Sequence, residues 1–160
     1  MTDEELSQKQ LEAPPRAFEI NVDAQGRLQI PEDWQQFFVG KLDAREFFIT
    51  LDKGWIKIFP KRLWEMQNAT AFREKSEEEY EAWSITMQHY GWITGFDSKY
   101  RLTPHENLRT KLGLRGSVLT MMNHMGTLRG KLKADFEQIQ PQAEEASQKQ
   151  QSRPDGQRML

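Results

Sequence analysis

The chain contains no cysteine among its 160 residues, and it has no long hydrophobic run. The absence of cysteine excludes disulfide frameworks, thiolate metal sites and cysteine nucleophiles, and it favours a cytosolic protein. No apolar stretch approaches the roughly 20 residues that a membrane-spanning helix needs. The acidic residues 1–5 lack the basic-then-apolar order of a signal peptide. We therefore expect a soluble, cytoplasmic protein that does not contact a membrane.

Patterns typical of enzymes and metal sites are also missing. The three histidines, His89, His105 and His124, are too scattered to form a ligand set with a familiar spacing. No serine or cysteine nucleophile signature accompanies them. We expect no cofactor, no metal and no catalytic activity.

The sequence does contain enough apolar surface for a folded core, and its charge is unevenly distributed. Hydrophobic residues make up 37% of the chain, with five Trp and nine Phe. Although the formal net charge is -2, residues 91–137 hold eight Lys/Arg against four acids. The acids gather instead at residues 3–5 and 77–79. This basic segment is the natural place to look for an anionic partner.

Composition also predicts where the ordered units begin and end. Pro14-Pro15 closes a polar leader, and the end of the chain is rich in Gln, Glu, Ser and Lys. Tyr80, Trp83, Met87 and Tyr90 follow at helical spacing after an acidic first turn, which predicts an amphipathic helix between two units. The expected organisation is a disordered leader (1–15), unit 1 (16–67), a linker helix (68–90), unit 2 (91–137) and a largely disordered polar tail (138–160).

The two units repeat the same order of elements. Each has a strand, an Asp-x-x-x-Arg turn, a second strand, a helix that begins at proline, a hairpin with a glycine turn and a closing helix. Asp23 and Asp97 are 74 residues apart, as are Arg27 and Arg101. Such a shared order is much harder to obtain by chance than any single motif.

The chemistry of the Asp-x-x-x-Arg turn allows two interpretations. The aspartate accepts hydrogen bonds from turn amides, and the arginine four residues later begins the next strand close by. In the first interpretation the two side chains form an internal ion pair that pins the hairpin, which is worth about 0–1 kcal/mol when exposed. In the second, the arginine projects toward a phosphate or a guanine edge, which suits its planar bidentate donor.

These repeated turns, with Pro31 and Pro104, the Gly54 hairpin and the helix at Leu63-Trp64, resemble the MraZ family of the AbrB-like superfamily over roughly residues 17–137. The resemblance implies an α+β fold, mainly β, in which two AbrB-like swapped-hairpin units form a pseudo-twofold β-barrel with short flanking helices. It implies a transcription regulator of the division and cell-wall gene cluster that assembles into a ring. Its partner is then double-stranded DNA carrying promoter direct repeats, and its location is the nucleoid. The implied DNA-facing residues are Asp23, Gln25, Arg27, Asp97, Lys99 and Arg101.

Each copy departs from the family's usual Asp-x-Lys-Gly-Arg turn at one position. The first copy has Gln25 in place of lysine and keeps Gly26, whereas the second keeps Lys99 and has Tyr100 in place of glycine. If this position needs positive φ, Tyr100 either incurs a steric cost of roughly 1–2 kcal/mol or forces a different turn. Loss of the lysine removes one phosphate neutralisation per subunit.

Several features of the sequence allow two interpretations. Trp55 and Trp64 suit a core better than a base-stacking platform. The basic run at residues 129–133 either extends a positive face or protects a solvated strand edge. For the whole chain, the alternatives to a ring-forming DNA regulator are an oligomeric interaction protein that does not bind DNA, or a single-dimer AbrB-type regulator.

Overall fold

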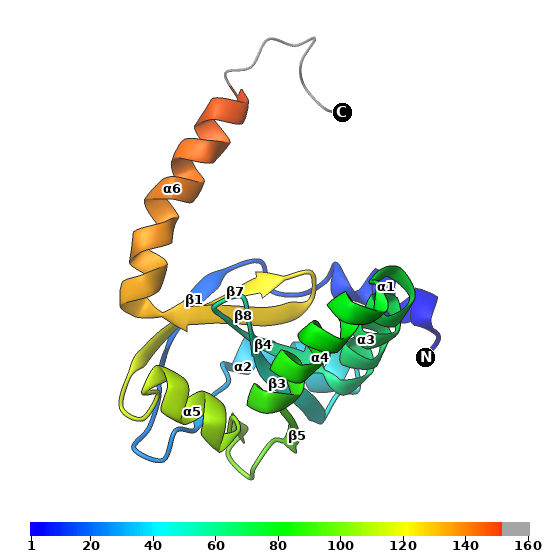
Figure 1. Ribbon diagram of the computed structural model, residues 1–160. Coiled ribbons are helices and arrows are strands. Elements are labelled where there is room, and N and C mark those ends of the chain that lie inside the picture. Colours follow the sequence, from blue (N-terminus) through cyan, green and yellow to red (C-terminus); the bar gives the residue numbers. More distant parts are fainter. Residues whose placement is uncertain (152–160) are drawn as a thin grey trace.

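The computed structural model describes residues 1–151, and it is an α+β structure built around one sheet (Figure 1). A short π-helical segment, η1, continues α2. The elements in chain order are α1 (Asp3–Gln10), β1 (Ala17–Asn21), β2 (Leu28–Gln29), α2 (Glu32–Gln35), η1 (Gln36–Lys41), β3 (Glu46–Asp52), β4 (Trp55–Pro60), α3 (Lys61–Glu74), α4 (Glu77–Tyr90), β5 (Trp92–Gly95), β6 (Arg101–Leu102), α5 (Glu106–Leu112), β7 (Val118–His124), β8 (Thr127–Leu132) and α6 (Lys133–Gln151).

The six-stranded sheet is antiparallel throughout and mixes strands from both halves of the chain. Its order is β1-β7-β8-β4-β3-β5. The first strand of each half pairs with the hairpin of the other half, since β1 lies against β7 and β5 lies against β3. The two hairpins then meet at the centre through β4 and β8. The two halves are therefore joined by strand exchange, and neither could form this sheet alone.

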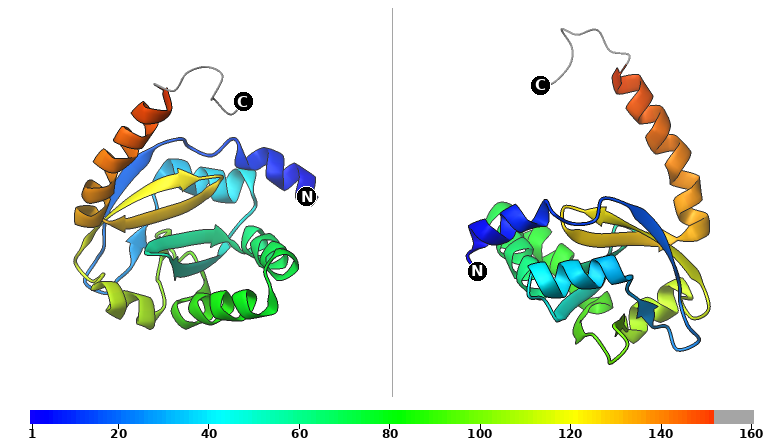
Figure 2. Two further views of the ribbon diagram at one scale, coloured as in Figure 1. Left: turned by 45° about the horizontal axis from the view of Figure 1, so that its top comes forward. Right: turned by 180° about the vertical axis from the view of Figure 1, so that it is seen from behind.

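One face of the sheet packs on the segment formed by α2 and η1, which crosses in front of the sheet in the view from behind (Figure 2, right). Trp34, Phe37 and Phe38 are the aromatic residues of that segment, and all three are buried. The rings of Phe38 and Phe47 meet edge to face at 5.0 Å between centroids. Because side chains alternate along a strand, β4 buries Ile56 and Ile58 on this face.

The opposite face is partly covered by the helix pair α3 and α4. Trp64 of α3 stacks on Phe48 with 4.0 Å between ring centroids, and Trp83 of α4 stacks on Trp64 at 5.5 Å. Thr50, which is fully buried, donates from its hydroxyl to the carbonyl oxygen of Met87 at 2.8 Å. Trp64 is half-buried, and these contacts make it part of the aromatic packing between the sheet and the helix pair.

The expected mainly β fold with a pseudo-twofold barrel is wrong. Helices account for 47% of the structure. Within residues 1–151, the six-stranded sheet is open and does not close into a barrel. Closing a barrel would require β2 and β6 to extend the sheet, but each has two residues and they pair only with each other. Pro31 and Pro104 follow soon after these strands, and proline has no N–H with which to continue a ladder.

The expected disordered leader is also wrong. Thr2 caps α1, its hydroxyl accepting a hydrogen bond from the backbone N–H of Glu5, and acids in the first turn favour the helix dipole. Leu6 is 3% exposed and belongs to the core. This single buried leucine anchors a helix whose sequence has no apolar stripe.

The linker is divided between two helices, and the tail contains more helix than expected. The predicted linker helix at 68–90 is the end of α3 and all of α4, separated where Ser76 and Glu79 form a capping box. The predicted tail at 138–160 is helical as far as Gln151, because α6 continues through Pro141 and projects away from the sheet (Figures 1 and 2). The rest of the tail lies outside the described residues. The division into two units stays a prediction.

No helix within residues 1–151 combines the length and the apolar character that crossing a membrane requires.

Replacing Leu6 by alanine tests whether α1 is part of the folded core. We expect Leu6→Ala to lower the free energy of unfolding by about 2–3 kcal/mol, because a buried leucine is lost. Leu11→Ala is the matched control, since Leu11 is 82% exposed, and its effect should stay within about 0.5 kcal/mol. Urea unfolding measures both, and equal stabilities for the two variants would mean that α1 does not pack.

Candidate nucleic-acid interface

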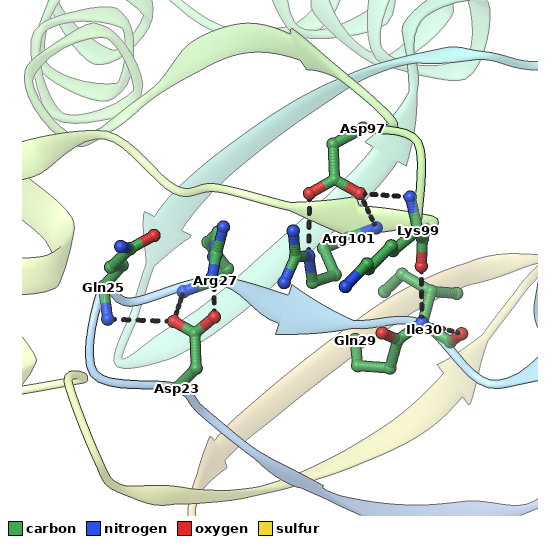
Figure 3. Close-up of polar contacts among 8 residues, drawn as sticks. All are labelled: Asp23, Gln25, Arg27, Gln29, Ile30, Asp97, Lys99 and Arg101. Carbon is green, nitrogen blue, oxygen red and sulfur yellow. Dashed lines mark hydrogen bonds and ion pairs between the residues drawn. The ribbon is translucent and has the colours of Figure 1, made fainter.

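The two Asp-x-x-x-Arg turns have the same hydrogen bonds (Figure 3). In the first, Oδ1 of Asp23 accepts from the backbone N–H groups of Gln25 at 2.9 Å and Arg27 at 2.8 Å. In the second, Oδ1 of Asp97 accepts from Lys99 at 2.8 Å and Arg101 at 2.9 Å. Each aspartate therefore closes its own turn with one carboxylate oxygen.

The other carboxylate oxygen pairs with the arginine of the same turn. Nε of Arg27 donates to Oδ2 of Asp23 at 2.6 Å, and Nε of Arg101 donates to Oδ2 of Asp97 at 2.8 Å. Within residues 1–151, the Nη atoms of these two arginines make no hydrogen bond. The ion pair fixes each guanidinium by one nitrogen and leaves its bidentate edge uncommitted.

Both carboxyl groups are held in the charged form. Donation from the backbone N–H of Arg101 is the largest influence on Asp97, and with its side chain and the Lys99 amide it lowers the pKa to about 2 despite some desolvation. For Asp23, partial burial acts to raise the pKa, but hydrogen bonds from Arg27 and from the Gln25 amide outweigh it, and the pKa is lowered. The turns thus remain ion-paired at any physiological pH.

The β2–β6 ribbon brings the two turns together. Its antiparallel register places Leu28 opposite Leu102 and Gln29 opposite Arg101. Leu28 and Leu102 are completely buried and face the core. Because successive side chains alternate, Arg27, Gln29 and Arg101 lie on the outer face of the ribbon. Arg27 and Arg101 are therefore diagonal neighbours across one ribbon, although 74 residues separate them in the sequence.

Contacts between the two turns tighten this arrangement. The side-chain amide of Gln29 donates to the carbonyl oxygen of Lys99 at 2.9 Å, and the backbone N–H of Ile30 donates to the carbonyl oxygen of Tyr100 at 3.3 Å. Gln25 and Lys99 are exposed beside the arginines. The structure therefore brings all six candidate residues into one surface region.

Tyr100 adopts the same turn as Gly26. Its φ is +58°, and that of Gly26 is +83°. Tyr100 therefore incurs the steric cost of a positive φ and does not force a different turn. The ring of Tyr100 packs edge to face on Phe96, with 5.3 Å between centroids, which partly offsets the unfavourable backbone.

The surroundings of the two turns differ. Arg109 of α5 donates from Nη1 to the carbonyl oxygen of Gln25 at 3.1 Å and from Nη2 to Oε2 of Glu106 at 2.8 Å. Glu106 also pairs with Arg115 at 3.3 Å. These arginines flank the first turn, and sequence reasoning did not include them in the site. Their only signal was the excess of Lys/Arg in residues 91–137.

The basic run at residues 129–133 lies elsewhere. It belongs mainly to β8, which is hydrogen-bonded to β7 on one side and to β4 on the other. The interpretation as a solvated strand edge is therefore wrong, because β8 is a central strand.

No protein-family model matches the sequence, and no curated protein matches it.

Glycine at position 26 is expected to matter for the first turn. Gly26→Ala should lower the free energy of unfolding by roughly 1–2 kcal/mol, because the φ of +83° disfavours a Cβ. That Cβ would also stand 2.5 Å from Cδ of Arg109. Gly40→Ala is the control, since no atom lies within 4 Å of its Cβ position. Urea unfolding that gives equal losses for both variants would contradict the assigned turn.

The lowered pKa of Asp97 predicts an acid sensitivity. Because its folded-state pKa of about 2 lies below the ordinary 3.8, the unfolded chain binds the proton first. The stabilisation is complete above pH 3.8 and is lost as the pH falls toward about 2. Asp97→Asn should remove this part of the pH dependence. Urea unfolding at several acidic pH values checks it, and parallel profiles for the variant and the wild type would contradict it.

Proposed function

We propose that this protein is a sequence-specific transcription regulator that binds double-stranded DNA through its two Asp–Arg turns, as the resemblance to the MraZ family implies. The observation that supports this most is the pair of half-buried arginines on the outer face of one ribbon, each held by Nε with its Nη edge uncommitted. Arginine in this state is a preorganised bidentate donor for a phosphate or for O6 and N7 of guanine.

The aspartates act as positioning groups in this proposal. An unpaired arginine would lose side-chain entropy on binding DNA, whereas Asp23 and Asp97 have already fixed the guanidinium planes. Lys99 and Gln25 stand beside the arginines and contact the backbone or neighbouring bases. Because Lys99 is charged and Gln25 is not, the second turn contributes more to the salt dependence of binding. Arg115, which lies beside the first turn, compensates in part for the charge that Gln25 lacks.

One ribbon offers few contacts, so the proposal includes assembly into a homo-oligomeric ring that binds short direct repeats in a promoter. Linked sites raise avidity by about 10²–10⁴ when their spacing matches. The regulated genes are then those of the division and cell-wall cluster, and the protein works at the nucleoid.

A second candidate is an interaction protein that does not bind DNA. The formed ion pairs favour it, since each arginine already has a partner within its own turn. The two candidates differ in whether the Nη atoms of Arg27 and Arg101 contact DNA.

Substitution of the arginines separates the candidates. Arg27→Ala and Arg101→Ala should each weaken binding to the upstream DNA by about 10- to 100-fold, because a good bidentate contact is worth about 1–3 kcal/mol. Arg27→Lys should also lose sequence preference while keeping its charge. Gel shift at fixed salt measures each variant.

Arg73→Ala is the control for loss of one positive charge, because Arg73 lies near the end of α3 and its hydrogen bond is to Thr70. It should bind as the wild type does. Wild-type affinity in both ribbon variants would reject the DNA-binding role.

A further inference from the structure

A second group of basic residues lies on the sheet face opposite the core, where β4 meets β8. Lys57 and Arg129 are directly opposite each other in the register of these two strands. Trp55 and Lys131 follow two residues along on the same face. We call Lys57, Arg129 and Lys131 the sheet-face cations. They belong to the two central strands, and the β2–β6 ribbon forms a separate sheet.

The three cations are unequally partnered. Nζ of Lys57 pairs with Oδ2 of Asp52 at 2.8 Å, and Nζ of Lys131 donates to the carbonyl oxygen of Gly54 at 3.0 Å. Arg129 places its guanidinium 4.3 Å from the centre of the Trp55 ring. In residues 1–151, the side chain of Arg129 has no hydrogen bond and no ion pair, and its Nε atom is buried without a partner.

This arrangement is electrostatically incomplete. Like charges directly opposite on neighbouring strands are destabilising, and half-buried cations lack the full solvation of water. Within the described part of the chain, Asp52 is the one carboxylate that pairs with the three cations. Burial lowers the pKa of the adjacent His124, and the positive charges of Arg129 and Lys57 lower it further. An anion at this place would relieve all of these costs.

From this geometry we propose that the sheet-face cations form a binding site for a phosphate group. The guanidinium of Arg129 supplies a planar bidentate donor, and Lys57 on the facing strand and Lys131 two residues along β8 supply point charges. Trp55 holds Arg129 and Lys131 in place through cation–π contacts of 4.3 and 4.7 Å. Because both cations already lie over its ring, Trp55 does not offer a stacking surface for a base, and the site recognises the phosphate alone.

Two sources can supply this phosphate: a free phosphorylated small molecule, or the backbone of a nucleic acid. The same chemistry serves both. The site is independent of the ribbon arginines, so the proposal stands or falls separately from the proposed promoter binding.

The experiment follows the Arg129 guanidinium and the His124 ring by NMR in the isotopically labelled full chain at neutral pH. Sodium pyrophosphate and a short DNA duplex of unrelated sequence are titrated separately, each against sodium chloride at matched ionic strength. The expected result is a saturable shift of both side chains with pyrophosphate, with the duplex or with both. A shift with pyrophosphate identifies the free source, and a shift with the duplex alone identifies the nucleic-acid backbone.

Variants assign the shift to the sheet face. Arg129→Gln and Lys131→Gln should each weaken the binding by about tenfold or more, as expected for a lost charge-assisted contact. The Lys131 variant keeps the measurement decisive if Arg129→Gln does not fold. Arg27→Ala with Arg101→Ala should leave the pyrophosphate-dependent shifts of Arg129 and His124 unchanged, and Lys111→Gln on α5 is the matched control for one lost charge.

Three results would overturn the proposal. One is the absence of any shift, or an equal shift with chloride. Another is pyrophosphate binding that survives Arg129→Gln but disappears in the Arg27/Arg101 double variant, which would locate the anion at the ribbon. The last is self-association that requires Arg129 while no phosphate binds, because carboxylates of a second copy would then occupy this face.

Discussion

The exchange of first strands between the two halves is the constraint on which the rest of the structure depends. Because β1 pairs with β7 and β5 pairs with β3, the segment after each exchanged strand is carried to the same side of the sheet. There β2 and β6 have only each other to pair with. The ribbon that joins Arg27 to Arg101 is thus a product of the exchange, and neither half of the chain could make it alone.

Within that ribbon, two carboxylates do most of the organising. Each aspartate accepts hydrogen bonds from two turn amides and from one arginine. The four-residue spacing in the sequence therefore fixes the position of each guanidinium. The two turns share this geometry although Tyr100 stands where the first turn has Gly26, so the carboxylate's hydrogen bonds form despite an unfavourable φ. Their surroundings differ, because Arg109 and Glu106 brace the first turn and Phe96 supports the second.

Local patterns in the sequence predicted the order of elements, the glycine hairpins and the repeated turns, because alternation and turn chemistry are local properties. The hairpin around Gly54, for example, is confirmed by the pairing of Asp52 with Trp55. Partners distant in the sequence were not predictable in this way. The helical leader depends on a pocket for Leu6, the open sheet depends on which strands pair, and the bracing by Arg109 depends on where α5 packs. The helical part of the tail was underestimated because its helix formers lack an apolar stripe.

The most direct test of DNA binding by the β2–β6 ribbon is to map where DNA contacts the protein, by following backbone and arginine side-chain NMR signals as the upstream promoter DNA is added. If the ribbon binds DNA, the largest changes will fall together on residues 23–27 and 97–101, including the Nη groups of Arg27 and Arg101. If the NMR signals of the two turns do not change, and the changes are confined to α3 and α4 or are absent altogether, the ribbon is not the DNA-binding surface.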